Sequence, residues 1–87
     1  MADQIWQVGV TFTEEDDRTR ADATLDLADH RFHGYGRAKK APEDPTVPVI
    51  GQELAAARAL SDLAHQLLHA AAERIEEREG HAVEVHG

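Results

Sequence analysis

The sequence predicts an α+β domain of β-β-β-α order, a three-stranded antiparallel meander with one long C-terminal helix packed on one face. Three observations support this fold class. Apolar and polar residues alternate with a period of two within residues 5–38, as they do in half-buried strands. Prolines cluster in residues 39–50, which predicts a stiff connection. The stretch that follows is rich in Ala and Leu, which favour helix. At 87 residues, a single domain spanning 1–87 is expected.

The first strand is expected at residues 5–13, and the acidic run at residues 14–17 is interpreted as a solvated loop. The second strand is expected at residues 19–28 and the third at residues 31–38. A two-residue turn at Asp29-His30 would join them, because Asp tolerates the positive φ that such turns require. In the first strand, the residues that alternate with small or polar ones are Trp6, Val8, Val10 and Phe12.

The predicted turn sets the register of the second and third strands. Leu25 would face Gly34, and on the opposite face Asp22 would face Arg37 in a pair of opposite charge. Gly34 and Gly36 would both lie on the inward face, where a helix backbone could approach closely.

A long helix is expected at residues 51–78, because the interior of this segment contains no Gly or Pro. Its apolar stripe should face the sheet. Leu60, Leu67 and Phe32 are therefore predicted to be buried, and residues 79–87 are expected to form a loose tail. The stripe consists of Ala57, Leu60, Ala64, Leu67, Leu68, Ala71 and Ile75.

This helix is too long for its own sheet, which predicts a homodimer. It would measure roughly 40 Å, whereas a strand of eight residues spans about 26 Å. A second strip of small residues on the helix is a candidate contact with a twofold-related copy. The alternative is a monomer with a kinked or shorter helix. The candidate strip consists of Ala56, Ala59, Leu63 and Ala70.

The net charge of −8 argues against broad binding to nucleic acid or anionic lipid. One region is nevertheless basic and carries an aromatic residue, so it is the candidate binding patch. The alternative is that these cations only neutralise neighbouring acids such as Asp22 and Asp26. The patch consists of Arg31, Tyr35, Arg37, Lys39 and Lys40.

Metal binding and catalysis have little support in the sequence. His65 and His69 are four residues apart on the predicted helix, which makes them weak candidates for a metal or small ligand. The zinc-protease motif requires Glu after the first His, but Gln66 stands there. The alternative is an exposed helix face with a His69–Glu73 pair. We expect no cofactor and no enzyme activity. No membrane span is expected, since no apolar run approaches 18 residues, and a cytoplasmic location is expected as well.

Residues 47–64, which read VPVIGQELAAARALSDLA, resemble the signature of a family of small uncharacterised actinobacterial proteins. Trp6 and the strand opening Arg18-Thr19-Arg20-Ala21 fit the same family, and the resemblance extends over about residues 5–78. It implies a fold like the double-stranded-RNA-binding domain (dsRBD-like) and an association with dormancy and low-oxygen stress. It also implies a shape similar to that of ribosome-hibernation factors.

The resemblance does not carry an RNA site with it. Double-stranded-RNA-binding domains present lysines at the start of their last helix, but residues 51–55 read GQELA. Binding of duplex RNA in that manner is not expected. The sequence instead predicts a non-enzymatic, stress-associated binding protein that acts as a homodimer with a ribosomal or protein partner. The alternatives are a protein-interaction module without a nucleic-acid role, or a weak metal or small-ligand binder.

Overall fold

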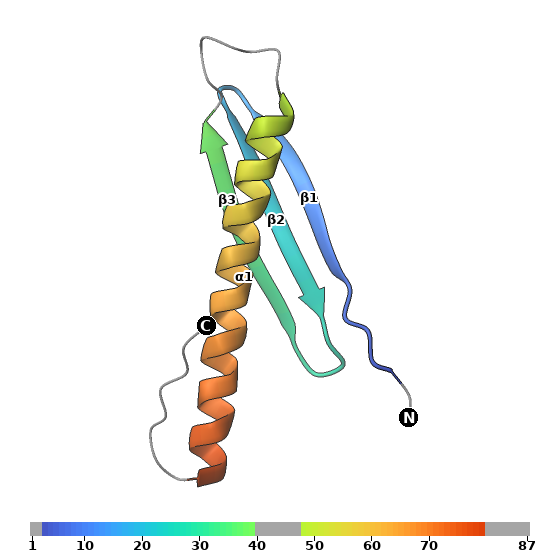
Figure 1. Ribbon diagram of the computed structural model, residues 1–87, viewed down its shortest axis with the longest axis vertical. Helices are drawn as coiled ribbons and strands as arrows, with labels where there is room; N and C mark the ends of the chain where they lie inside the picture. The colour runs from blue at the N-terminus through green and yellow to red at the C-terminus, as the bar shows by residue number, and fades with distance from the viewer. Residues whose placement is uncertain (1–2, 40–47, 80–87) are drawn as a thin grey trace.

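Three antiparallel strands in the order β1-β2-β3 form a sheet, and one long helix lies across one face of it (Figure 1). The computed structural model describes residues 3–39 and 48–79. The predicted α+β meander with its C-terminal helix is therefore confirmed. Most of the predicted connection at residues 39–50 and of the tail at residues 79–87 lies outside the described residues. The elements are β1 (Val8–Glu15), β2 (Arg18–Asp26), β3 (Arg31–Lys39) and α1 (Pro48–Glu79).

The first hairpin is tighter than predicted. β1 extends to Glu15, so that residues 16–17 alone form the turn and the predicted acidic loop is wrong for Glu14 and Glu15. Glu14 lies opposite Thr19, and the buried Thr19 hydroxyl donates to the Glu14 carboxylate at 3.2 Å. This hydrogen bond satisfies a buried polar group and favours strand over loop at Glu14.

The second hairpin turns one residue earlier than predicted. The Leu27 amide donates to the His30 carbonyl at 2.8 Å, so that residues 28–29 form the turn. Leu25 consequently faces Phe32 rather than Gly34. Because the pairing shifts by two residues and not by one, every side chain keeps its predicted face of the sheet. The shift brings the two bulkiest side chains of the core into one cross-strand pair.

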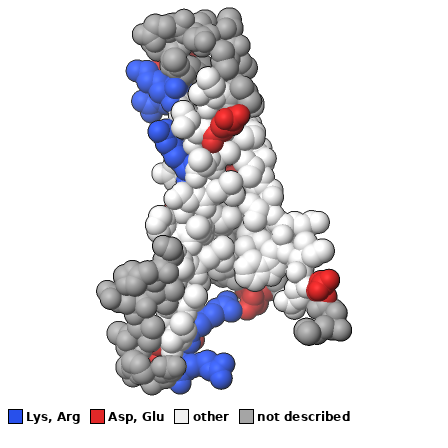
Figure 2. All heavy atoms as spheres, viewed as in Figure 1, with Lys and Arg blue, Asp and Glu red and all other residues white. Residues whose placement is uncertain are grey.

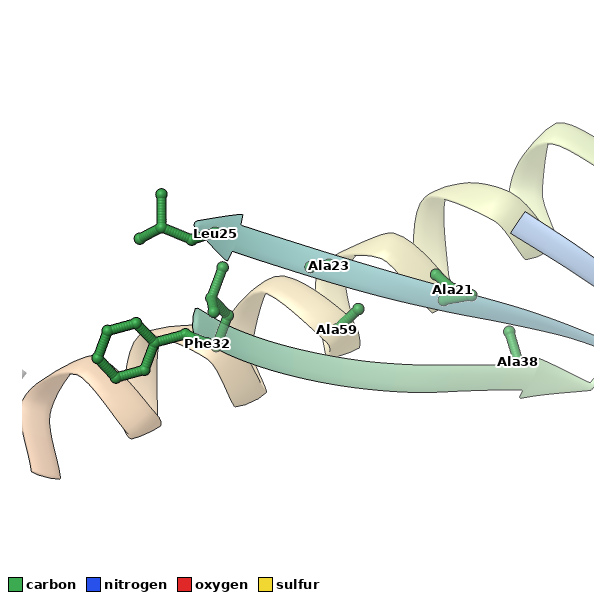
Figure 3. Close-up of a cluster of buried hydrophobic side chains, with 8 residues drawn as sticks. Ala21, Ala23, Leu25, Phe32, Ala38 and Ala59 are labelled. Atoms are coloured by element: carbon green, nitrogen blue, oxygen red, sulfur yellow. The ribbon is translucent and has the colours of Figure 1, made fainter. Parts of the chain in front are cut away.

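The helix backbone approaches the sheet closely at two glycines, as predicted. A Cβ built on Gly34 would lie 2.5 Å from the Ala59 carbonyl oxygen, and one on Gly36 would lie 2.6 Å from the Ala55 carbonyl oxygen. Figure 3 shows Ala59 on the helix facing the small side chains of β2 and β3. The core is therefore built mainly from alanine, and it consists of Ala21, Ala23, Leu25, Phe32, Ala38, Ala55, Ala59 and Leu63.

The helix presents a different stripe to the sheet from the one predicted. Leu63 is only 3% exposed, whereas Leu60 is 41% exposed and Leu67 is half-buried. The prediction of a buried Leu60 is wrong, while that of a buried Phe32 is confirmed. At Gly34 the nearest helix atoms are backbone atoms of Ala59 and Leu63, so these two residues face the sheet at the closest approach. That close approach rotates α1 so that the predicted stripe faces sideways.

The same rotation corrects the predicted partner strip. Ala59 and Leu63 are buried in the core of their own chain, and Ala56 and Ala70 are half-buried. These four residues face the sheet of the same molecule, so they do not form a surface for a second copy.

Candidate anion-binding face

The face of the sheet that points away from α1 is the outer face. Along β3, buried and exposed residues alternate strictly, because successive strand side chains point to opposite sides. Four members of the predicted patch therefore share the outer face, while Lys40 lies outside the described residues. Those four exposed residues are Arg31, Tyr35, Arg37 and Lys39.

Strand β2 adds two cations that the predicted patch lacks. Arg20 lies opposite Arg37, and Arg18 lies opposite Lys39. We call these four residues the cationic block. The predicted register placed Asp22 opposite Arg37, and the same register would put Arg20 opposite Lys39. It therefore missed the two observed pairs, which a turn one residue earlier gives.

Tyr35 lies between the two central guanidinium groups of the cationic block. The Arg20 Cζ atom is 4.9 Å from the centroid of the Tyr35 ring, and the Arg37 Cζ atom is 5.9 Å from it. Cations at these distances are attracted by the ring electrons. The Tyr35 residue is 51% exposed, so part of it remains accessible from solvent.

Acidic neighbours neutralise only part of the cationic block. Arg20 Nη2 is 3.0 Å from Asp22 Oδ1, and His33 Nε2 is 2.7 Å from the same oxygen. The Arg20 guanidinium and the His33 ring hold the pKa of Asp22 below its ordinary value. Arg18 reaches Asp17 only at 4.0 Å. Within residues 3–39 and 48–79, Arg37 and Lys39 form no ion pair.

The other end of the outer face is electrically neutral. Arg31 forms an ion pair with Asp26, which is its cross-strand neighbour. Its second nitrogen, Nη2, is 3.4 Å from Asp26 Oδ2. This contact lowers the pKa of Asp26. Arg31 therefore lies in the predicted patch, but Asp26 neutralises its charge.

The outward edge of β3 is covered by side chains from one flank of α1. The contributing helix residues are four apart and therefore lie in one row. Their contacts fix β3 against the helix and so fix the direction in which its outer side chains point. The Arg58 guanidinium donates to the Arg37 carbonyl at 2.6 Å, the Tyr35 amide donates to the Asp62 carboxylate at 3.0 Å, and the Gln66 amide donates to the His33 carbonyl at 2.6 Å. In the view of Figure 2, Lys and Arg side chains gather beside this edge.

The two helix histidines each have a neighbour of their own. His65 Nδ1 is 2.9 Å from the Ser61 carbonyl oxygen, and His69 Nε2 is 2.9 Å from Glu73 Oε1. Across the part of the chain that the structure describes, no three His, Cys, Asp or Glu side chains are grouped to hold a metal. Within those same residues, no helix has the length and apolar character needed to cross a membrane.

The chain is similar to proteins of mycobacteria that carry the description uncharacterised. A family model described as Rv2632c-like matches residues 4–84. Rv2632c of Mycobacterium tuberculosis is 52% identical over 61 residues, which cover 70% of this chain and 66% of that protein, just under two thirds of its length. The uncharacterised protein Mb1767 of Mycobacterium bovis is 41% identical over 73 residues, covering 84% of this chain and 78% of the relative. The crystal structure of Rv2632c matches with a TM-score of 0.85 at 42% identity, covering 93% of this chain and 96% of that one.

Proposed function

This chain belongs to the Rv2632c-like family, and from that premise we propose that it is a non-enzymatic cytoplasmic protein that binds ribosomal RNA in stressed, non-growing cells. The contact is the cationic block on the outer face. The observation that carries the proposal is the placement of Arg20 opposite Arg37, directly beside Arg18 opposite Lys39.

Two adjacent cross-strand pairs of like charge are unfavourable when no anion is bound to the sheet. Like charges directly opposite each other on neighbouring strands destabilise the pairing. Asp22 compensates Arg20, but the described residues supply no carboxylate for Arg37 or Lys39. A phosphate group above these two side chains would remove the repulsion. The block therefore gains more from an anionic ligand than an evenly paired surface would gain.

The chemistry of the block favours unpaired RNA over a duplex. A net charge of −8 repels a long polyanion everywhere except at this block, so only a few phosphates are in contact. Tyr35 is partly exposed, and an aromatic ring of this kind is a surface on which the face of an unpaired base can stack. Ribosomal RNA offers such unpaired segments at its surface.

Sedimentation of the full chain with purified ribosomes tests this proposal. We expect cosedimentation at low salt and release at raised salt. The logarithm of the binding constant should fall with the logarithm of salt with a slope of about −2 to −3, as for three or four contacts to single-stranded phosphates. Arg37→Gln should weaken binding and make the slope shallower by about 0.7.

Arg31→Gln is the matched control, because it makes the same change on the same strand at a residue already paired with Asp26. It should leave binding close to that of the wild type. Equal loss in the two variants would exclude the cationic block as the contact. A wild-type chain that does not sediment with the ribosomes at any salt concentration would overturn the proposal.

A further inference from the structure

Strand β1 is left uncovered on the face that the helix should protect. α1 packs on β3 and β2, which leaves β1 at the open side of the sheet (Figure 1). Val8 and Phe12 point to the same face as the buried Leu25 and Ala21 that they pair with. They are nevertheless 43% and 40% exposed. Among the described residues no strand pairs with the outer edge of β1.

The flank of α1 that faces β1 is mainly apolar, in contrast to the flank over β3. Arg58, Asp62 and Gln66 lie on the β3 side, where they bind the strand backbone. Leu67 and Ala71 lie on the opposite side, where they line a cavity of about 150 Å³ whose walls also include Trp6, Leu27 and Arg74. At 100° per residue, the exposed Leu60 and Ala64 share the side of Ala71.

We call these surfaces together the apolar face, which consists of Val8 and Phe12 of β1 with Leu60, Ala64 and Ala71 of α1. Figure 2 looks onto the helix side of the molecule and shows few charged side chains over the middle of α1 and the adjoining β1. Charged side chains of both signs gather toward the two ends of that view. Large exposed apolar patches rimmed by polar residues mark interaction sites, and this pattern favours one here.

We propose that the apolar face binds a second copy of this chain, with the two α1 helices antiparallel around a twofold axis. One antiparallel register satisfies shape and charge together. It places Leu60 of each copy beside Ala71 of the other, and Ala64 beside Leu67 (in both pairs the residue numbers have the same sum). Large side chains then meet small ones along the whole contact.

The same register brings together the charged residues that end the apolar flank. Glu53 lies near the start of α1 and Arg78 lies near its end, and both are exposed on the β1 side of the helix. Within the described residues neither forms an ion pair. In the antiparallel pair each Glu53 meets the Arg78 of the other copy. A surface that is complementary to itself in this way fits a second copy better than an unrelated partner.

The helix length agrees with this arrangement. The 32 residues of α1 extend about 48 Å, whereas the strands of eight or nine residues extend about 30 Å. The part of α1 beyond the sheet has no strand beneath it in its own chain. An antiparallel partner helix covers that part. The inference is independent of ribosome binding, because the cationic block lies on the opposite face of the sheet.

Sedimentation equilibrium of the full chain and of two neighbouring variants tests the interface. The wild type should reach twice the chain mass of 9.6 kDa at about 100 µM. Ala64→Arg places a charge in the apolar face and should raise the dimer dissociation constant about 100-fold or more. His65→Arg adds the same charge at the next residue, on the side of α1 that faces away from β1, and should leave the dimer intact. Thermal melting checks that both variants fold.

Disulfide trapping tests the register itself, since the chain contains no cysteine. A mixture of Leu60→Cys and Ala71→Cys chains should form mixed disulfide dimers under mild oxidation, in preference to dimers of either variant alone. Glu53→Arg and Arg78→Glu should each weaken the dimer, and the double variant should recover it.

Three outcomes would overturn the proposal. The first is a wild type that remains a monomer at that concentration, which would leave the apolar face to a partner of different sequence. The second is equal dimerisation of the Ala64 and His65 variants. The third is disulfide formation without preference for the mixed pair. Should Ala64→Arg fail to fold, the trapping result alone decides.

Discussion

The carboxylate of Asp62 on α1 accepts a hydrogen bond from the main-chain amide of Tyr35 on β3 at 3.0 Å. This contact joins the helix to the strand that carries the candidate binding site. It fastens the helix to the edge of the sheet, and it holds the strand residue whose ring lies near the guanidinium groups of both Arg20 and Arg37. The helix therefore orients the candidate binding site without contributing a side chain to the outer face.

Asp62→Ala should lower the free energy of unfolding by about 1 kcal/mol, because the Tyr35 amide loses a charged acceptor while water still reaches it. Asp62→Asn keeps an acceptor oxygen and should cost less. Urea denaturation of the three proteins measures the difference. Identical unfolding midpoints would show that the contact does not stabilise the β3 edge.

Gly34→Ala should destabilise the domain by about 1–3 kcal/mol, because the added methyl group would meet the Ala59 carbonyl oxygen at 2.5 Å and push α1 off the sheet. Gly9→Ala is the matched control on β1. There the added carbon would lie 3.6 Å from Thr24 Oγ1, an ordinary contact, so stability should hold or rise slightly. Thermal unfolding of both variants measures the loss of stability. An equal loss in the two variants would contradict the close approach of α1 to Gly34.

Leu63→Ala should cost about 2–5 kcal/mol, because it opens a cavity under a side chain that is 3% exposed. Leu60→Ala should cost well under half of that in a dilute monomer, since Leu60 is 41% exposed. Chemical denaturation of both variants at low protein concentration measures the two losses of stability. The reverse order would mean that the helix is rotated toward the stripe predicted from the sequence.

Acid should destabilise the outer face. The pKa values of Asp22 and Asp26 are lowered in the folded chain, by Arg20 and His33 in the first case and by Arg31 in the second. Their stabilisation is therefore fully present above the unfolded-state pKa of about 3.9, and it is lost as pH falls through the lower folded values. Thermal midpoints between pH 7 and pH 2.5 measure this loss. Asp22→Asn should make the thermal midpoint fall less steeply at acid pH. An unchanged fall would exclude Asp22 as a contributor.

Local patterns in the sequence were sufficient for the architecture. Alternation along β3 assigned every side chain to its face, and that assignment survived a turn displaced by one residue. The inward position of Gly34 and Gly36 predicted the close helix approach. Arg37 was placed on the outer face for the same reason, since a period of two depends on the strand alone.

The pairing of the cations required the tertiary structure. The predicted register would put Arg20 opposite Lys39, and only the observed register pairs it with Arg37. A turn at residues 28–29 and one at residues 29–30 both satisfy local preferences, so the packing of Leu25 against Phe32 selected between them. Cross-strand partners depend on register, and in this hairpin the core determines the register.

The sequence by itself determined the elements, their order and the faces of each strand, because these follow from short-range periodicity and backbone propensity. Only the tertiary structure decided which side of α1 is buried. The helix carries apolar residues around more than half of its circumference, so periodicity alone favoured the stripe with Leu60. Glycine at 34 and 36 leaves room for the helix backbone to lie against β3, and this close approach of Ala59 and Leu63 turns Leu63 inward and leaves Leu60 on the surface.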